Sequence, residues 1–141
     1  MNAKEELFGF IRDEFDVDPD YPFPNDRESA VFRHRTNRKW FALFMPRISL
    51  RKLGAERDGE ADIVNLKCDP FLSGALRSIS GVFPAYHMNK EHWLSVLLDG
   101  SVDKETLFGL IAASYELTFL KAKKEKRGRQ GSDERVDGKK E

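Results

Sequence analysis

The first regular pattern along the chain is helical and covers residues 3–15. One face of this segment carries apolar residues at intervals of three or four positions, namely Leu7, Phe8, Ile11 and Phe15. Asn2 stands immediately before the segment, and Glu5 follows Asn2 by three positions, as in a helix capping box. We therefore predict one amphipathic helix at this point in the chain.

A loop and a β-hairpin are predicted to follow this helix. Three prolines interrupt residues 18–26, and we expect the Tyr21 and Phe23 rings of this loop to lie over the core. Residues 30–36 and 39–45 are rich in β-branched and aromatic residues, which is typical of two paired strands. The short polar segment between them predicts a tight turn.

The length of that turn decides which side chains of the hairpin face each other. If the loop consists of Asn37 and Arg38 alone, Arg35 lies opposite Trp40, and its guanidinium can stack on the indole ring. A loop of three residues would shift the pairing by one position and remove this contact. The sequence leaves both registers open.

The second half of the chain contains the remaining strands and helices. In order, the pattern predicts a connection over residues 46–60, a strand over 62–68, a helix that begins at Asp69 and Pro70, a hairpin of 82–88 and 92–98, and a helix over 103–120. We expect the shorter of these helices to bury an apolar face that includes Phe71, Leu72, Leu76 and Ile79.

The order of elements, α-βββ-α-ββ-α, predicts an α+β fold of two layers, with helices packed on a mostly antiparallel sheet. Beyond Leu120 the apolar pattern ends, and residues 121–141 contain almost no apolar residue. Such a segment buries too little surface to offset the entropy of ordering, so we expect a disordered, charged tail. The prediction is therefore one domain over residues 1–120 and a tail over 121–141.

Cysteine content and the first residues bear on location. The 141 residues include one cysteine, Cys68, so no disulfide can form within the chain, which fits a reducing compartment. The first turns are acidic, unlike a secretory signal, and no apolar run approaches the roughly 20 residues of a membrane-spanning helix. We expect a cytoplasmic, monomeric protein without membrane association or cofactor.

Charge is distributed unevenly, although the net charge is zero. The segment from Ala30 to Ala55 contains seven basic residues and no acidic one. Residues 1–120 hold 15 basic and 19 acidic residues, a net charge of −4, whereas residues 121–141 hold nine and five, a net charge of +4. A dedicated non-specific nucleic-acid binder is usually basic throughout, so this chain instead has one basic segment on an acidic body.

Several short motifs resemble those of the MmcQ/YjbR family. The most specific is the stretch from Pro84 to Trp93, PAYHMNKEHW; the same family pattern is matched by KWFAL (39–43), NLKCDP (65–70), LDG (98–100) and SYEL (114–117). The resemblance extends over the predicted domain. It implies a fold like that of the type III secretion chaperones, with the same order of elements, and a DNA-binding role in which two hairpins project as a double wing.

The residues best suited to nucleic acid lie at the turns of the two hairpins. Phosphates are bound by cations, exposed bases stack on aromatic rings, and a projecting β-ribbon fits a major groove. The predicted nucleic-acid-binding surface consists of Arg33, Arg35, Arg38, Lys39 and Trp40 of the first hairpin, with His34 among them, and His87, Lys90 and His92 of the second.

The basic segments also fit roles that involve no ligand. The bases of the first hairpin can pair with the acids of residues 1–29, which would leave a solvated turn. The basic stretch Lys121–Arg129 can add non-specific phosphate affinity or serve only as a solvated chain end. The sequence leaves both alternatives open.

Functions of two other classes also fit the sequence. A secretion-chaperone-like fold allows an adaptor that binds a peptide at a sheet edge or in an apolar groove. His87 and His92 at a four-residue turn, with Cys68 as a third ligand, would form a metal site, but no CxxC or HxxxH pattern accompanies them. We expect His87 and Asn89 to satisfy backbone groups of the turn while Trp93 packs, with no metal site and no catalytic residue.

Overall fold

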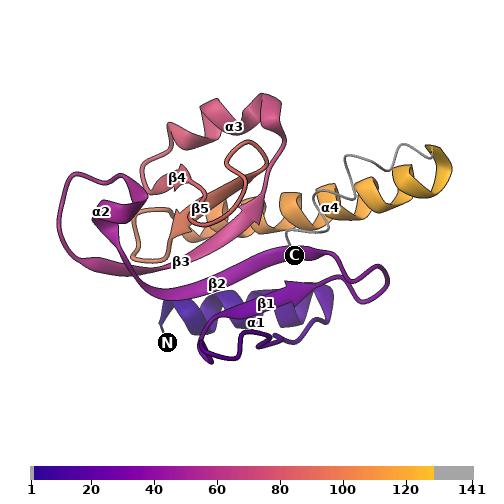
Figure 1. Ribbon diagram of the computed structural model, residues 1–141, viewed down its shortest axis with the longest axis horizontal. Helices are drawn as coiled ribbons and strands as arrows, with labels where there is room; N and C mark the ends of the chain where they lie inside the picture. The colour runs from indigo at the N-terminus through magenta and orange to yellow at the C-terminus, as the bar shows by residue number, and fades with distance from the viewer. Residues whose placement is uncertain (1, 129–141) are drawn as a thin grey trace.

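The computed structural model of the protein describes residues 2–128, with side chains as far as Phe119. Its elements are, in order, α1 (Ala3–Phe15), β1 (Ala30–Arg33), β2 (Trp40–Ser49), α2 (Leu50–Leu53), β3 (Glu60–Lys67), α3 (Pro70–Arg77), β4 (Val82–Pro84), β5 (Trp93–Leu97) and α4 (Lys104–Gly128) (Figure 1). The strands of this region form one sheet in the order β1-β2-β3-β5-β4, with every neighbouring pair antiparallel. The predicted α+β class with an antiparallel sheet is confirmed.

One face of the sheet is covered by α1 and α4 (Figure 1). Leu7 and Ile11 of α1 and Leu107 and Ile111 of α4 are buried there. They pack against alternate residues of the strands, which include Phe32, Phe44, Val64, Leu66, Leu94 and Val96. Because side chains alternate along a strand, the residues between these point to the opposite face.

The opposite face is closed by loops and by the short helix α2. One buried cluster on this face contains Trp40, Ala85 and Trp93, and the Phe23 ring packs against it as predicted. A second cluster lies beneath α2, to which Leu50 contributes. The β4–β5 loop and α2 therefore rest on this face, whereas the β1–β2 turn lies beside the end of α1.

Side-chain caps begin the three longer helices at the positions that the sequence indicates. The backbone N–H groups of Glu5, Phe71 and Thr106 donate to the side chains of Asn2, Asp69 and Asp103, at 2.8, 2.9 and 2.8 Å. Each such cap typically stabilises a helix by about 1 kcal/mol.

The last helix is longer than its apolar pattern. It continues past the predicted end at Leu120 to Gly128, so the first part of the predicted tail is helical. Lysine, alanine, glutamate and arginine dominate this extension, and all four favour helix. Residues 129–141, the rest of the predicted tail, lie outside the described residues. No helix among residues 2–128 combines the length and apolar character needed to cross a membrane.

The register of the first hairpin differs from the one that places Arg35 on Trp40. Arg33 pairs with Trp40, and a bulge lies between Phe32 and Arg33. The turn therefore contains all of residues 34–39, and the guanidinium of Arg33 lies 5.6 Å from the centre of the Trp40 ring. A longer turn moved this contact to the neighbouring arginine on the same face.

Strand β2 also extends further than predicted, into the expected connection over residues 46–60. It passes through an irregularity between Met45 and Ile48 before it reaches Ser49, and α2 follows directly. Pro46 has no N–H to give to a ladder, so it fits a strand only at such an interruption. The proline marks a bulge rather than the end of the strand.

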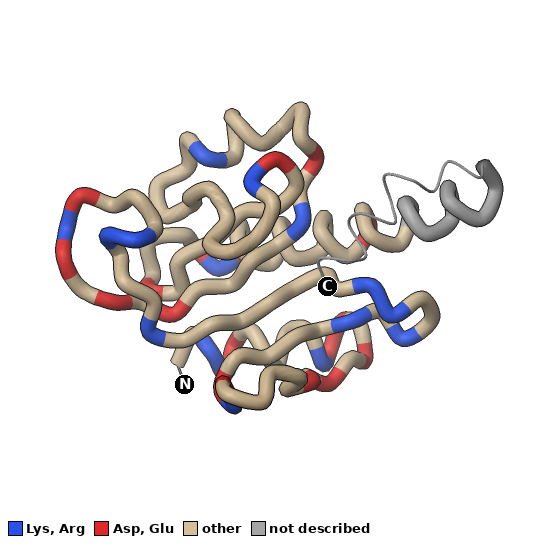
Figure 2. Tube along the Cα trace, viewed as in Figure 1, with Lys and Arg blue, Asp and Glu red and all other residues tan. Residues whose placement is uncertain are grey.

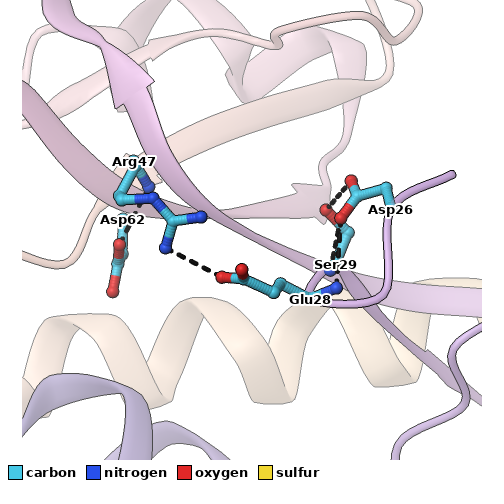
Figure 3. A network of polar contacts seen from close by, with 5 residues as sticks. All are labelled: Asp26, Glu28, Ser29, Arg47 and Asp62. Atoms are coloured by element: carbon cyan, nitrogen blue, oxygen red, sulfur yellow. Dashed lines mark hydrogen bonds and ion pairs between the residues drawn. The ribbon is translucent and has the colours of Figure 1, made fainter.

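A polar network fixes this bulge to the start of β1 (Figure 3). Arg47 has a positive φ of 52°, and its backbone N–H donates to Asp62 at 3.0 Å. Its guanidinium donates to Glu28 at 2.8 Å, while the Ser29 hydroxyl donates to Asp26 at 2.6 Å. The hydrogen bond from Ser29 lowers the pKa of Asp26. Asp26 and Glu28, two of the acids of residues 1–29, therefore stabilise the fold.

The apolar face predicted for α3 is only partly buried, and this prediction is wrong for its first turn. Phe71 is 96% exposed and Leu72 is 53% exposed, whereas Leu76 and Ile79 pack against the core. The exposed pair lies in the first turn of α3, and the packed pair lies at the other end, just before and just after Arg77. Tyr21, expected over the core, is also exposed.

Candidate nucleic-acid interface

The turn between β1 and β2 is closed by its own backbone. The N–H of His34 donates to the carbonyl of Lys39 at 2.9 Å, and the N–H of Arg38 donates to the carbonyl of His34 at 3.1 Å. The Asn37 side chain accepts from the Lys39 N–H at 2.8 Å, and Arg38 has a positive φ of 65°. This conformation leaves the Arg35 and Arg38 side chains exposed, whereas Lys39 is half-buried.

His34 joins the turn to α4 and does not belong to the basic surface. Its side chain is 1% exposed, and its Nε2 lies 3.0 Å from the carbonyl oxygen of Tyr115 and 2.7 Å from the Thr118 hydroxyl. The Thr118 hydroxyl itself donates to the carbonyl of Ser114 at 2.9 Å. Because the Tyr115 carbonyl can only accept, Nε2 carries a hydrogen and donates it. Burial lowers the pKa of His34, against the opposing effects of the Tyr115 carbonyl and Glu116.

Acidic residues that follow α1 lie beside the first hairpin (Figure 2), and two of them form ion pairs with its arginines. Arg33 donates to Asp20 at 2.9 Å, and Arg35 donates to Asp16 at 2.6 Å. The Arg35 and Asp16 side chains are 67% and 77% exposed, and pairs this exposed contribute at most about 1 kcal/mol. The pairing foreseen with residues 1–29 therefore exists, but water or a competing anion can replace it at Arg35.

These side chains line an open hollow of about 480 Å³. Asp16, Asp18 and Asp20 form one side of it, and Arg33, Arg35 and Arg38 form the other. Among residues 2–119, Arg38 has no carboxylate within ion-pair distance, and it is exposed at the tip of the turn. The hollow is thus mixed in charge at its base and basic at its outer edge.

The end of α4 lies on the same side of the molecule as this turn (Figure 1). The His34 contacts hold Tyr115 and Thr118 at the root of the turn, and the helix continues from there to Gly128. Residues 121–128 hold five basic residues and one acidic residue. The part of α4 that leads into this basic extension therefore lies beside the β1–β2 turn, although the two are about 80 positions apart in the sequence.

The second predicted hairpin is mainly a loop, because β4 ends at Pro84 and β5 begins at Trp93. A buried network anchors this loop to the sheet. The Tyr86 N–H donates to the Ser95 hydroxyl at 2.8 Å, and that hydroxyl donates to Asn65 at 2.5 Å. The Asn65 amide returns a hydrogen bond to the Tyr86 carbonyl at 2.9 Å.

Residues of the PAYHMNKEHW motif hold this loop in shape. The Asn89 side chain accepts from the N–H groups of Glu91 and His92, at 2.8 and 3.2 Å, and Lys90 Nζ donates to the Ala85 carbonyl at 2.8 Å. Trp93 is buried, as expected. Asn89 therefore satisfies backbone groups as predicted, and the motif that carries the family resemblance builds the loop.

Five of the eight predicted nucleic-acid-binding residues line two separate hollows, whereas Trp40 is buried. Arg33, Arg35 and Arg38 line the first. His87 and Lys90 line a second hollow, together with residues of α2 and α3 that the sequence did not suggest: Arg51, Lys52 and Arg77. Figure 2 shows α2 and the β1–β2 turn at opposite ends of the sheet. Arg51 and Lys52 belong to the acid-free segment that the sequence shows, but only the fold places them in one hollow with Lys90.

The histidines and the cysteine of the second half are arranged differently from a metal site. His87 is exposed and has a positive φ of 59°, whereas His92 is half-buried. The Cys68 N–H donates to the His92 carbonyl, and burial raises the pKa of the Cys68 thiol. Among residues 2–119, no three side chains of histidine, cysteine, aspartate or glutamate gather closely enough to hold a metal ion.

Comparisons with known proteins agree on one family. The family model described as YjbR matches residues 15–117. The uncharacterised protein YyaQ of Bacillus subtilis strain 168 is 38% identical over 118 residues, which cover 84% of this chain and 99% of that protein. The uncharacterised protein YjbR of Escherichia coli K12 is 42% identical over 65 residues, 45% of this chain and 55% of that protein. These names denote no enzymatic activity.

Solved structures share the fold. A crystal structure of a Pseudomonas syringae protein has a TM-score of 0.78 and 42% sequence identity, and the match covers 84% of this chain and 99% of that one. A Deinococcus radiodurans protein has a TM-score of 0.62 and 27% identity, with 98% of this chain and 89% of that one covered.

Proposed function

This chain belongs to the YjbR family, and from that premise and the charges at one end of its fold we propose that it binds nucleic acid through the β1–β2 turn. Arg35 and Arg38 contact phosphates, with Lys39 beside them. A guanidinium binds a phosphate with two parallel hydrogen bonds, which are stronger than those between neutral groups. A short β-ribbon of this kind also fits the width of a major groove.

One observation carries the proposal: His34 fixes the basic turn to α4. Because of this contact, the turn and the basic end of the last helix approach a ligand from the same side. The rest of the domain is acidic, so binding depends on these two segments and is modest and sensitive to salt. The exposed Arg35–Asp16 pair opens when a phosphate replaces the carboxylate.

Fluorescence anisotropy with labelled duplex and single-stranded DNA tests this function. We expect binding at low salt. The logarithm of the association constant should fall by about 0.9 per phosphate contact for each tenfold rise in salt concentration. A chain of residues 1–120 should bind more weakly and with a shallower salt slope, because it lacks the basic end of α4. No binding by the full chain at low salt would contradict the proposal, and complete loss on truncation would place the contacts on the helix alone.

A second candidate function is a protein adaptor, which the exposed start of α3 favours. Phe71 and Leu72 project beside an apolar groove of about 250 Å³ between α3 and α4. Its charged lining residues are Asp69, Glu116 and the buried Lys67, and its apolar lining includes Leu66, Leu72, Leu76, Leu94, Leu110 and Leu117. An exposed apolar patch with an acidic edge suits an amphipathic helix of a partner that carries basic residues beside its apolar stripe.

A helical model peptide of leucine and lysine tests this adaptor surface. We expect the full chain to bind it, and Phe71→Asp with Leu72→Asp to weaken binding by about tenfold, because both side chains would leave an apolar contact. The matched control is a leucine and glutamate peptide of the same pattern, which should not bind. Equal affinity of the variant and the native chain would exclude the groove as the docking site.

A further inference from the structure

We propose that the second hollow is a binding site for a nucleoside phosphate, in which cations from three elements hold the phosphate and the His87 ring stacks on the base. The hollow has a volume of about 640 Å³, within the range of small-molecule sites. Its cations are Arg51 and Lys52 of α2, Arg77 of α3 and Lys90 of the β4–β5 loop. This inference does not rest on the proposed nucleic-acid contact, whose cations lie at the other end of the sheet.

The cations of this hollow are available to an anion. No acidic residue belongs to its lining. Arg51 pairs with Asp58 at 2.8 Å, but these side chains are 60% and 89% exposed, so a bound phosphate can replace the carboxylate at little cost. Among residues 2–119, neither Lys52 nor Arg77 has a carboxylate within ion-pair distance. Lys90 uses one of its three N–H donors on the Ala85 carbonyl and keeps two.

Each element of the hollow is held in place by the fold. Leu50 and Leu53 bury one side of α2, and Gly54 ends this helix with a φ of 106°. The network of Asn65, Ser95 and Tyr86 fixes the β4–β5 loop to the sheet. The four cations on these supports repel one another without a ligand, and a bound phosphate removes that repulsion without having to order the backbone.

The ring at the edge of the hollow gives the site its second contact. The His87 ring stacks on the Tyr86 ring, with centroids 4.0 Å apart and planes 11° from parallel. His87 is exposed, so the face turned away from Tyr86 can receive another planar ring. Its positive φ is uncommon outside glycine and is maintained by the loop around it. A ligand with a phosphate and a base uses both features.

Isothermal titration calorimetry on the full chain at low salt tests the site with three probes: inorganic phosphate, adenosine monophosphate and a short thymidine oligonucleotide. We expect submillimolar binding of the adenosine monophosphate. Lys52→Glu with Arg77→Glu should weaken it at least tenfold, because two of the four cations are reversed. Arg35→Glu with Arg38→Glu is the matched control: it changes the net charge equally, lies at the other end of the sheet, and should leave this binding unchanged.

His87→Ala separates the two contacts of the ligand. It should weaken adenosine monophosphate but not inorganic phosphate, because only the base uses the ring. Binding of the oligonucleotide alone, lost in Lys52→Glu with Arg77→Glu, would support the site and identify nucleic acid as the source of the phosphate. The site is overturned if none of the three probes binds, or if both double variants weaken binding equally. Failure of the proposed nucleic-acid contact at the β1–β2 turn is recognised separately, because duplex DNA binding would then be unaffected by Arg35→Glu with Arg38→Glu.

Discussion

Changing Arg35 and Arg38 together to glutamate will weaken duplex DNA binding by about 100-fold at low salt and will reduce the salt slope by about two. Both side chains are exposed on the β1–β2 turn, and each accounts for one phosphate contact in the proposed interface. The two new carboxylates would also repel the backbone that the guanidiniums attract. Anisotropy titrations at several salt concentrations measure both quantities.

Two further variants show whether the loss is local. Lys52→Glu with Arg77→Glu changes the net charge by the same amount at the other end of the sheet and should leave duplex affinity within a few-fold of the native value if the turn is the contact. Asp16→Asn should do the opposite of the turn variant and tighten binding, because it releases Arg35. Asp16 has a φ of 58°, a conformation that asparagine tolerates, so this change keeps the fold. Equal losses of duplex affinity in both double variants would indicate a general effect of net charge and would contradict a contact at the turn.

Acidification below pH 6.5 will destabilise the protein through His34. Burial lowers the pKa of His34 in the folded state. Below about pH 6.5, the unfolded chain takes up a proton on this ring that the folded chain does not bind, so stability decreases as the pH falls. Above that pH, the ring is neutral in both states and contributes nothing. The slope from this one proton is at most about 1.4 kcal/mol per pH unit.

Urea unfolding between pH 7.5 and 5.5 measures this slope. His34→Phe is the control: its ring can occupy the same place between Phe41 and Tyr115, and it cannot take up a proton. Its free energy of unfolding should vary less with pH over this interval. The range stops above pH 5 because Asp26 and Asp103, whose pKa values are lowered, lose their stabilising effect only at more acidic values. Identical slopes for both proteins would mean that His34 is not the titrating group.

The elements of the fold were largely predictable because their signals are local. Asn2, Asp69 and Asp103 cap helices through neighbours two or three positions away, and the apolar spacing of α1 and α4 selects the faces that pack. The errors arose where the outcome depends on contacts that are not local. Pro46 indicates a break, yet a bulge lets β2 continue, since that depends on hydrogen bonds to a partner strand. Phe71 has the pattern of a buried residue, but its side chain is exposed in the first turn of α3.

The candidate sites were less predictable because they depend on contacts between distant residues. A longer turn, together with a bulge in the hairpin, moved the cation over Trp40 from Arg35 to Arg33. His34, which is surrounded by arginines in the sequence, points into the fold, where its ring contacts Tyr115 and Thr118 of α4. No local pattern predicts which arginine lies over Trp40 or which way the His34 ring points, since both depend on how distant segments pack together.

The sequence by itself determined the α+β class, the helix starts, the family motifs and the presence of a basic segment on an acidic domain. These follow from periodicity, capping and composition, which act over a few neighbouring positions. The tertiary structure decided which cations work together. It paired Arg35 with Asp16, fixed the basic turn to α4 through His34, and brought Lys52, Arg77 and Lys90 around one hollow. Charge acts through space, so its arrangement is set only when register, bulges and loop anchors bring distant segments together.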